Sequence, residues 1–211
     1  MKPEITAQQA SAPILRRKTT TGKRVLTAAI RILRNEGYAK MTMERVAAVS
    51  RVAKTTLYRR WPTKAALCME VYFEVAGREL ADPDAGNVAD DLKQILKTVV
   101  HLQTKTVAGQ AFIGVIAESH LKPDFQNDFL AEFAIRRREV TSHVLRRAIQ
   151  RGEILPKTDI DLVIDAIGGA TTFRLLQRHA PLTVGFANSI VDLVLSGCKT
   201  YPRKNKQASG G

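Results

Sequence analysis

The chain has 211 residues, 45% of them hydrophobic and 25% charged, which is enough apolar material to fold around a core. Lys and Arg outnumber Asp and Glu by 33 to 20, giving a net charge of +13. Residues 1–64 hold 15 of the cations and only 3 acids, whereas residues 65–211 are nearly neutral, with 18 cations and 17 acids. This asymmetry predicts a polyanionic partner for the N-terminal part, and nucleic acid is the commonest one.

Several classes of protein do not fit the sequence. No uncharged stretch reaches the roughly 20 apolar residues that cross a bilayer, and residues 1–20 contain no apolar core of a secretory signal. Cys68 and Cys198 lie far apart without metal-type spacing, so we expect packing residues in a reducing cytosol. The sequence therefore predicts a cytoplasmic protein with no membrane partner, no cofactor and no metal site.

The chain begins with a polar segment. Residues 1–19 lack periodicity and contain the basic run Arg16, Arg17 and Lys18. We interpret them as a flexible basic arm that contacts DNA, and a frayed, solvated tail is the alternative.

Three helices are expected next. From Thr21, apolar residues recur at helical spacing for about 15 residues, and Gly37 followed by Tyr38 supplies a left-handed stop. Thr42 is placed as the N-cap of a short helix that runs through Val49. A third helix is expected from Lys54 to Arg60, ended by Trp61 and Pro62.

The remaining pattern is also helical. No segment alternates polar and apolar residues long enough to predict a strand, so the fold class is all-α with about nine helices. Turn residues separate the remaining helices, which are expected at residues 63–80, 88–105, 108–119, 124–151, 159–178 and 183–198.

The second and third helices predict a helix-turn-helix whose second helix enters the major groove. Hydroxyls and cations on that helix can meet base edges and phosphates, and no acid occurs from Arg45 to Met69. The start of a flanking helix favours a phosphate, which sets register. The predicted DNA-binding residues are Arg16, Arg17, Lys18, Thr42, Arg45, Arg51, Lys54, Thr55, Thr56, Tyr58, Arg59, Arg60 and Lys64.

Alternatives stay open for several of these residues. Tyr58 can contact phosphate through its hydroxyl or pack against Leu33. Arg59 and Arg60 can form a merely solvated basic face. We interpret Trp61 as a packing residue between the third and fourth helices rather than a base-stacking residue.

Residues 20–70 resemble the tetracycline-repressor-like (TetR) transcriptional regulators. The resemblance rests on Ala28 to Tyr38, Thr42 to Ala47, and above all Lys54 to Lys64 followed by Ala65 to Leu67. Tyrosine, an aromatic–proline pair and a helix-starting lysine recur there at fixed spacing. The resemblance implies a homodimeric all-α repressor with an N-terminal DNA-binding domain and a C-terminal domain for dimerisation and small-molecule binding.

Three residues depart from the family pattern. Arg51 stands where the turn usually has glycine, which costs on the order of 1 kcal/mol if that residue keeps a positive φ. Ala53 replaces the usual serine and removes a cap worth roughly 0.5–2 kcal/mol. Thr55 takes a position that glycine often occupies.

The last two helices are candidates for pairing two copies. Residues 160–176 carry apolar side chains almost all round, which predicts burial on two sides, one against the chain's own core and one against a second copy. Two adjacent glycines in that helix fit a close backbone approach, and a kink is the alternative. The predicted dimer interface comprises Gly168, Gly169, Leu176, Phe186, Ile190, Leu193 and Val194.

The middle helices supply apolar residues at core spacing, most of them ordinary core residues. In the family a cavity opens among the corresponding helices, so we expect a small apolar or aromatic effector there, held by a few polar groups. The predicted ligand-binding residues are Phe73, Leu96, Val100, Gln103, Phe112, Ile116, His120, Phe133, Phe173 and Gln177.

The expected organisation is a basic arm (1–19), a DNA-binding domain (20–64), an effector-binding and dimerisation domain (65–200) and a flexible tail (201–211). We expect a ligand-responsive homodimeric repressor of a palindromic double-stranded operator, released by its effector. The alternative is a DNA-binding regulator or architectural protein that senses no small molecule. No phosphate-binding glycine loop, paired-histidine motif or serine elbow occurs, so we expect no enzyme.

Overall fold

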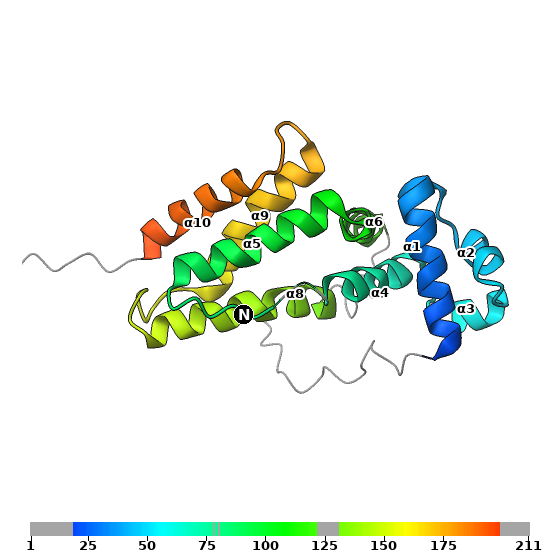
Figure 1. Cartoon of the computed structure of the whole chain (residues 1–211), viewed down its shortest axis with the longest axis horizontal. Helices are drawn as coiled ribbons and strands as arrows, with labels where there is room; N and C mark the ends of the chain where they lie inside the picture. The colour runs from blue at the N-terminus through cyan, green and yellow to red at the C-terminus, as the bar shows by residue number, and fades with distance from the viewer. Residues whose placement is uncertain (1–18, 78, 80, 122–130, 199–211) are drawn as a thin grey trace, which may run out of the picture. The chain divides into compact units, whose positions relative to one another are not determined.

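The structure is a computed structural model that describes residues 19–77, 79, 81–121 and 131–198, with the backbone alone at 120, 121, 131–134 and 136. Across these ranges the chain forms nine helices and no strand (Figure 1). The all-α prediction is confirmed. The described residues divide into two compact units, which we treat separately. The first unit takes the described residues up to Ala81 and from Thr98 to Glu139, and the second takes Asp82–Lys97 and those from Val140 onward.

Helix α1 (Thr20–Lys40) begins the first unit. The Thr19 hydroxyl caps it by accepting a hydrogen bond from the Gly22 amide at 3.1 Å. Gly37 has a φ of 81° and breaks the helical geometry, as its place in the sequence predicts. The chain then makes one more helical turn, so the helix ends three residues later than expected.

Helices α2 (Met43–Ser50) and α3 (Lys54–Arg60) form the predicted helix-turn-helix. Val46 and Leu57 face inward and are fully buried. The C-cap of α2 is Arg51, which has a φ of 53° and a ψ of 41°, so the arginine does occupy a left-handed conformation. Ala53 precedes α3 without a side-chain cap. Both departures from the family pattern therefore have the structural consequence that the sequence predicted.

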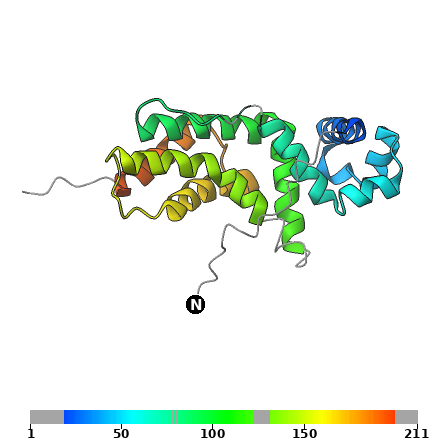
Figure 2. The same ribbon diagram turned by 90° about the horizontal axis from the view of Figure 1, so that it is seen from below.

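Helix α4 (Lys64–Ala76) packs most extensively against α6 (Val107–Leu121), and α6 also contacts α1 (Figure 2). The prediction that the fourth helix continues to Leu80 is wrong. Gly77 caps α4 through a hydrogen bond from its amide to the Phe73 carbonyl at 2.9 Å. Glycine is a poor helix former, so the helix ends one turn earlier than its apolar pattern suggested.

The second unit contains the first half of α5 (Val88–Lys105) and the second half of α8 (Ala131–Gln150), together with α9 (Ile160–Gln177) and α10 (Val184–Cys198). Figure 1 shows α9 and α10 side by side, and the two helices are in contact. These bounds match the expected helices to within a few residues. Residues 124–130 of the expected 124–151 helix lie outside the described residues.

Ion pairs surround the end of α8 in the second unit. Arg151 reaches Asp84 at 3.1 Å and Asp91 at 3.4 Å, and Asp91 is fully buried. Arg147 pairs with Asp82 at 2.9 Å. A buried carboxylate needs such a partner, so this cluster fixes the loop before α5 against α8.

Both cysteines are buried free thiols, in agreement with the packing role expected for them. Burial raises the pKa of the Cys68 thiol to about 12. Within the described ranges, no helix combines the length and the apolar character needed to cross a membrane.

Candidate nucleic-acid interface and ligand site

Helix α3 presents one apolar residue to the core and its polar residues to solvent. Leu57 is fully buried. Thr56 is half-buried, and the other polar residues up to Arg59 are exposed; these are Lys54, Thr55, Tyr58 and Arg59. Hydroxyl and cationic groups thus lie together on the outer side of the recognition helix, where base edges and phosphates can meet them.

Tyr58 is 41% exposed, whereas Leu33 is completely buried. The tyrosine therefore does not fill the core as the packing alternative required. Its hydroxyl donates a hydrogen bond to Glu44 Oε1 at 3.1 Å. Sequence reasoning missed Glu44, although this carboxylate meets the outer face of α3.

The turn before α3 is held by a residue that sequence reasoning missed. Arg24, on α1, donates from Nη2 to the carbonyl oxygens of Ser50 at 2.7 Å and Arg51 at 3.2 Å. A cation at these carbonyls stabilises the negative end of the α2 dipole. Arg51 itself is exposed beside this contact.

The start of α2 carries two of the predicted residues. The Thr42 hydroxyl accepts a hydrogen bond from the Arg45 amide at 3.1 Å, so Thr42 is the N-cap. The Arg45 guanidinium pairs with Glu36 at 3.0 Å and its side chain is 52% exposed. Arg45 therefore remains within reach of an external phosphate.

Arg60 differs from the prediction that groups it with Arg59. Its guanidinium pairs with Glu70 of α4 at 2.9 Å, with side-chain exposures of only 19% and 8%. The other Glu70 oxygen accepts a hydrogen bond from Trp61 Nε1 at 2.7 Å. Trp61 is 3% exposed and is a packing residue, as predicted. Arg60 is thus directed into the domain, and we remove it from the candidate DNA contacts.

Lys64 is the first residue of α4, but its ammonium already has internal partners. Nζ donates to the Tyr38 carbonyl at 2.8 Å and lies 3.6 Å from the centre of the Tyr38 ring. Burial lowers the Lys64 pKa from its ordinary value. A phosphate contact by Lys64 would have to replace this hydrogen bond, so its primary role in the structure is to join α4 to the end of α1.

Tyr38 in turn joins α1 to α6. Its hydroxyl donates to Glu118 Oε1 at 2.7 Å and to the Gly114 carbonyl at 3.2 Å. A Cβ on Gly114 would lie 2.0 Å from the Tyr38 ring, so only glycine admits the ring there. Burial, followed by the bond to Glu118, raises the Tyr38 pKa well above its ordinary value. The phenol therefore stays protonated and keeps donating at neutral pH.

The predicted ligand-binding residues do not all come together. In the first unit, Val100, Gln103 and Phe112 are buried and Phe73 and Ile116 are half-buried. Neither polar atom of the Gln103 side chain has a hydrogen-bond partner among the described residues. A buried amide without such a partner is costly, which makes Gln103 a candidate polar group for the ligand site.

The other predicted ligand residues stand elsewhere. Leu96 is buried in the second unit. Phe173 is 57% exposed and Gln177 is also exposed, so within one chain neither lies in a closed cavity, and a ligand contact by either one stays a prediction. The described structure does not include the side chains of His120 and Phe133, nor any part of Arg16, Arg17 and Lys18.

Sequence reasoning did not identify Arg137 as a partner of the aromatic residues. Its guanidinium carbon lies 4.1 Å from the ring centre of Phe112 and 5.8 Å from that of Tyr72. A guanidinium over an aromatic face is stabilised by the ring quadrupole. It brings a positive charge to Phe112, which the ligand prediction selected, and to Tyr72, which it did not.

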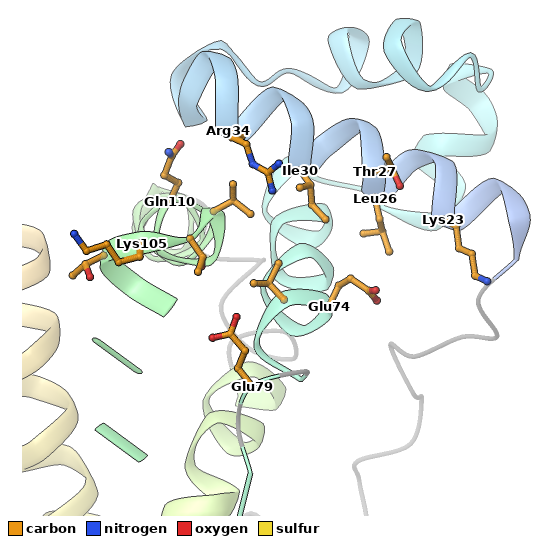
Figure 3. A pocket seen from close by; sticks show the side chains of 13 residues that line it. Lys23, Leu26, Thr27, Ile30, Arg34, Glu74, Glu79, Lys105 and Gln110 are labelled. Atoms are coloured by element: carbon orange, nitrogen blue, oxygen red, sulfur yellow. The ribbon is translucent and has the colours of Figure 1, made fainter. Parts of the chain in front are cut away.

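A cleft of about 1000 Å³ in the first unit lies among other residues (Figure 3). Lys23, Thr27 and Arg34 line it from α1, Lys105 lines it from the end of α5, and Gln110 lines it from α6. None of the ten predicted ligand residues lines this cleft. Many of its lining residues are polar, so a search for apolar residues at core spacing did not identify them.

Helices α9 and α10 keep an apolar face uncovered in the second unit. Leu162 is 65% exposed, Phe173 57%, Leu176 40% and Leu193 67%. Phe186, Ile190 and Val194 are half-buried. A Cβ added at Gly168 or Gly169 would meet no atom of the described residues within 4 Å. Packing within one chain therefore does not explain why glycine occurs at these two positions.

Two family models match the sequence. Residues 25–71 match the model described as "Bacterial regulatory proteins, tetR family", and residues 82–194 match "Tetracyclin repressor-like, C-terminal domain". The second match alone covers more than half of the chain. The chain belongs to the TetR family of transcriptional regulators. It is a DNA-binding regulator and not an enzyme.

Relatives extend this assignment to the TetR family. A crystal structure of the TetR family transcription regulator SCO0332 has 34% identity and a TM-score of 0.73, covering 87% of this chain and all of that one. The DNA-binding transcriptional repressor TetR of Mycobacteroides abscessus is 29% identical, over 85% of this chain and 94% of that protein. The regulator FadR of Bacillus subtilis, solved with stearoyl-CoA, is 20% identical with a TM-score of 0.59, over 83% of this chain and 98% of that one, and it supports the fold alone.

Proposed function

We propose that the chain is a cytoplasmic homodimeric repressor whose two α3 helices enter successive major grooves of a palindromic operator. A small molecule bound in the helical core would release it. The main support for DNA binding is the outer face of α3, where Lys54, Thr55 and Arg59 are exposed while the buried Leu57 anchors the helix. On this proposal residues 20–64 bind DNA and residues 65–200 bind the effector and pair the chains.

The side chains of α3 suggest a division of roles. Thr56 stands in the middle of the helix, where a hydroxyl can meet a base edge. Tyr58 and Arg59 follow it as exposed groups suited to phosphate oxygens. Base contacts set sequence preference, whereas phosphate contacts raise affinity for every duplex.

Selection of bound fragments from the source genome with purified protein tests this proposal. Selected fragments should share a short inverted repeat whose half-sites are centred about 34–36 Å apart. Thr56→Ala should relax preference at one base pair per half-site, and Tyr58→Phe should weaken binding to all duplexes. Fragments without a common repeat would favour an architectural DNA binder, and identical effects of the two substitutions would contradict the division of roles.

Dimerisation is supported by the uncovered face of α9 and α10. Contiguous exposed apolar side chains on a folded chain indicate an interaction surface. Leu162, Gly169, Phe173 and Leu176 follow one another after seven, four and three residues and so share one face of α9, and Leu193 continues the apolar surface on α10. A second copy offers the same face, so pairing about a two-fold axis buries both. Sedimentation of the purified chain should give a dimer.

Sensing is supported by the orphaned amide of Gln103. Val100 and Gln103 stand one turn apart on α5, as Phe112 and Ile116 do on α6, so each pair shares a helix face. We place a small apolar or aromatic effector at these residues, with Gln103 as its polar anchor. FadR of Bacillus subtilis, which was solved with stearoyl-CoA, offers a precedent in this fold for a ligand that carries an apolar acyl chain.

The effector proposal is tested by fluorescence anisotropy of an operator duplex titrated with small aromatic and aliphatic compounds. A compound that releases the wild type should fail with Gln103→Leu and still act on Gln110→Leu, since Gln110 lines the separate cleft. An effector prefers one conformation, so the operator must in turn weaken effector binding by the same factor. Release that does not depend on Gln103 would contradict this placement.

A further inference from the structure

A carboxylate lies among the groups that should bind phosphate. Glu44 is the only acidic residue between Glu36 and Glu70 in the sequence. Its Oε1 accepts a hydrogen bond from the Tyr58 hydroxyl at 3.1 Å and lies 4.0 Å from the Lys54 ammonium. The side chains of Lys54 and Glu44 are 61% and 55% exposed. Glu44 therefore already binds one donor of the outer surface of α3, the Tyr58 hydroxyl, and lies close to a second, the Lys54 ammonium.

The contacts of the Glu44 carboxylate favour its ionised form. A backbone amide at the start of α2 lowers the Glu44 pKa, the Tyr58 hydroxyl lowers it further, and Lys54 adds to the effect. Duplex DNA carries one negative charge per roughly 1.7 Å of its axis, so a phosphate and Glu44 cannot share Tyr58 and Lys54 without repulsion. A duplex phosphate that accepts the Tyr58 hydroxyl proton must displace the carboxylate from Tyr58, and it competes with the carboxylate for the Lys54 ammonium.

We infer that Glu44 is a specificity-determining residue that penalises every duplex except one presenting a cytosine amino group opposite it. The inference rests on the proposed use of α3 in the major groove. A displaced carboxylate next to phosphates, with no donor, opposes binding. The N4 amino group of cytosine is a donor that carboxylates accept in the major groove, so the correct sequence returns a partner to Glu44.

The alternative role for Glu44 is a general electrostatic brake. A brake would weaken binding to all sequences by the same factor, because phosphate contacts carry no sequence information. A specificity-determining Glu44 instead weakens binding to unrelated duplexes strongly and binding to the operator only slightly. The two roles are therefore separated by the ratio of two affinities rather than by either affinity alone.

The experiment compares wild type with Glu44→Gln by anisotropy on the selected inverted repeat and on a scrambled duplex of equal composition. Gln keeps an acceptor for Tyr58 and removes the charge. We expect Glu44→Gln to tighten binding to the scrambled duplex about tenfold and to the operator less than about threefold. Glu79→Gln is the matched control, because it removes one charge from the first unit outside the helix-turn-helix, and it should leave the ratio unchanged.

Base replacement supplies the second measurement. In wild type, replacing the cytosine that Glu44 contacts in each half-site should reduce affinity roughly tenfold. Glu44→Gln should bind with an affinity that no longer depends on this cytosine. It should instead prefer adenine at that position, because glutamine forms a hydrogen-bonded pair with adenine. Equal tightening on both duplexes, or no cytosine dependence, would overturn the inference. If wild type itself does not distinguish operator from scrambled DNA, the proposed function fails instead.

Discussion

Two exposed surfaces of this chain differ in what they present to solvent. The outer face of α3 offers ammonium, guanidinium and hydroxyl groups, whereas the face of α9 and α10 offers the uncovered side chains of Leu162, Phe173 and Leu193. Charged groups are well hydrated in the free chain. When they bind a polyanion such as DNA, the counterions released from the polyanion favour binding. Apolar groups gain only when water is removed from them. Each surface thus indicates the chemistry of its partner.

The largest expected effect comes from charging the apolar face. Leu193→Arg should abolish the dimer, because it would bury an unpaired guanidinium in the paired surface. The resulting monomer would place only one α3 on the operator. Loss of the second α3 should reduce operator affinity by roughly 100-fold or more. Sedimentation and operator titration measure both effects. Gln150→Arg, at an exposed residue of α8, should change neither.

Adjacent arginines on α3 allow the next test. Arg60→Ala should lower the free energy of unfolding by about 3 kcal/mol, because it leaves the buried Glu70 carboxylate without its cation. Arg59→Ala should change stability by less than about 0.5 kcal/mol. It should instead weaken binding to every duplex and reduce the salt slope by about one. Chemical denaturation and salt-dependent anisotropy separate the two roles, and equal stability losses would refute the assignment.

A glycine on the apolar face tests how closely the partner approaches. Gly169→Ala adds a methyl group that meets none of the described residues within 4 Å, so the helix alone should be stabilised by about 1 kcal/mol. If a second backbone packs there, dimer dissociation should increase instead. Gly185→Ala, on α10, is the control and should leave dimerisation unchanged. Unaltered dimerisation by Gly169→Ala would favour the kink interpretation of Gly168 and Gly169.

The smallest expected effect concerns the turn before α3. Arg51→Gly removes the left-handed strain and should raise stability by about 1 kcal/mol. If the exposed guanidinium contacts phosphate, the same substitution should weaken DNA binding. Ala53→Ser should add a cap worth roughly 0.5–2 kcal/mol without that loss of affinity. If Arg51→Gly raises both the free energy of unfolding and the affinity for DNA, a phosphate contact by Arg51 is excluded.

Local sequence predicted most of the helices because caps and stops act over a few residues. Thr42, Gly37 and the apolar period around Leu57 fixed α1 to α3 to within three residues. The end of α4 was missed, since Gly77 competes with a continuing apolar pattern and local rules do not say which prevails.

The candidate site was predicted less well, because its details depend on partners distant in sequence. Arg59 and Arg60 are chemically identical neighbours, and the partners that distinguish the inward one, among them Glu70 of α4 and Thr19, lie far from it in the sequence. Phe173 belongs to a helix that is apolar all round, so periodicity could not show which side faces the core. Glu44 could have been noticed as a lone acid in a basic segment, but its contact with Tyr58 required the fold.

Hydroxyl-radical footprinting of the selected genomic fragment tests the central claim most directly. Two chains that place α3 in successive major grooves should protect two patches per strand, about 10–10.5 base pairs apart and related by a two-fold axis. Leu193→Arg should abolish this paired pattern. A single protected patch, or even protection along the whole duplex, would contradict a paired helix-turn-helix on a palindrome.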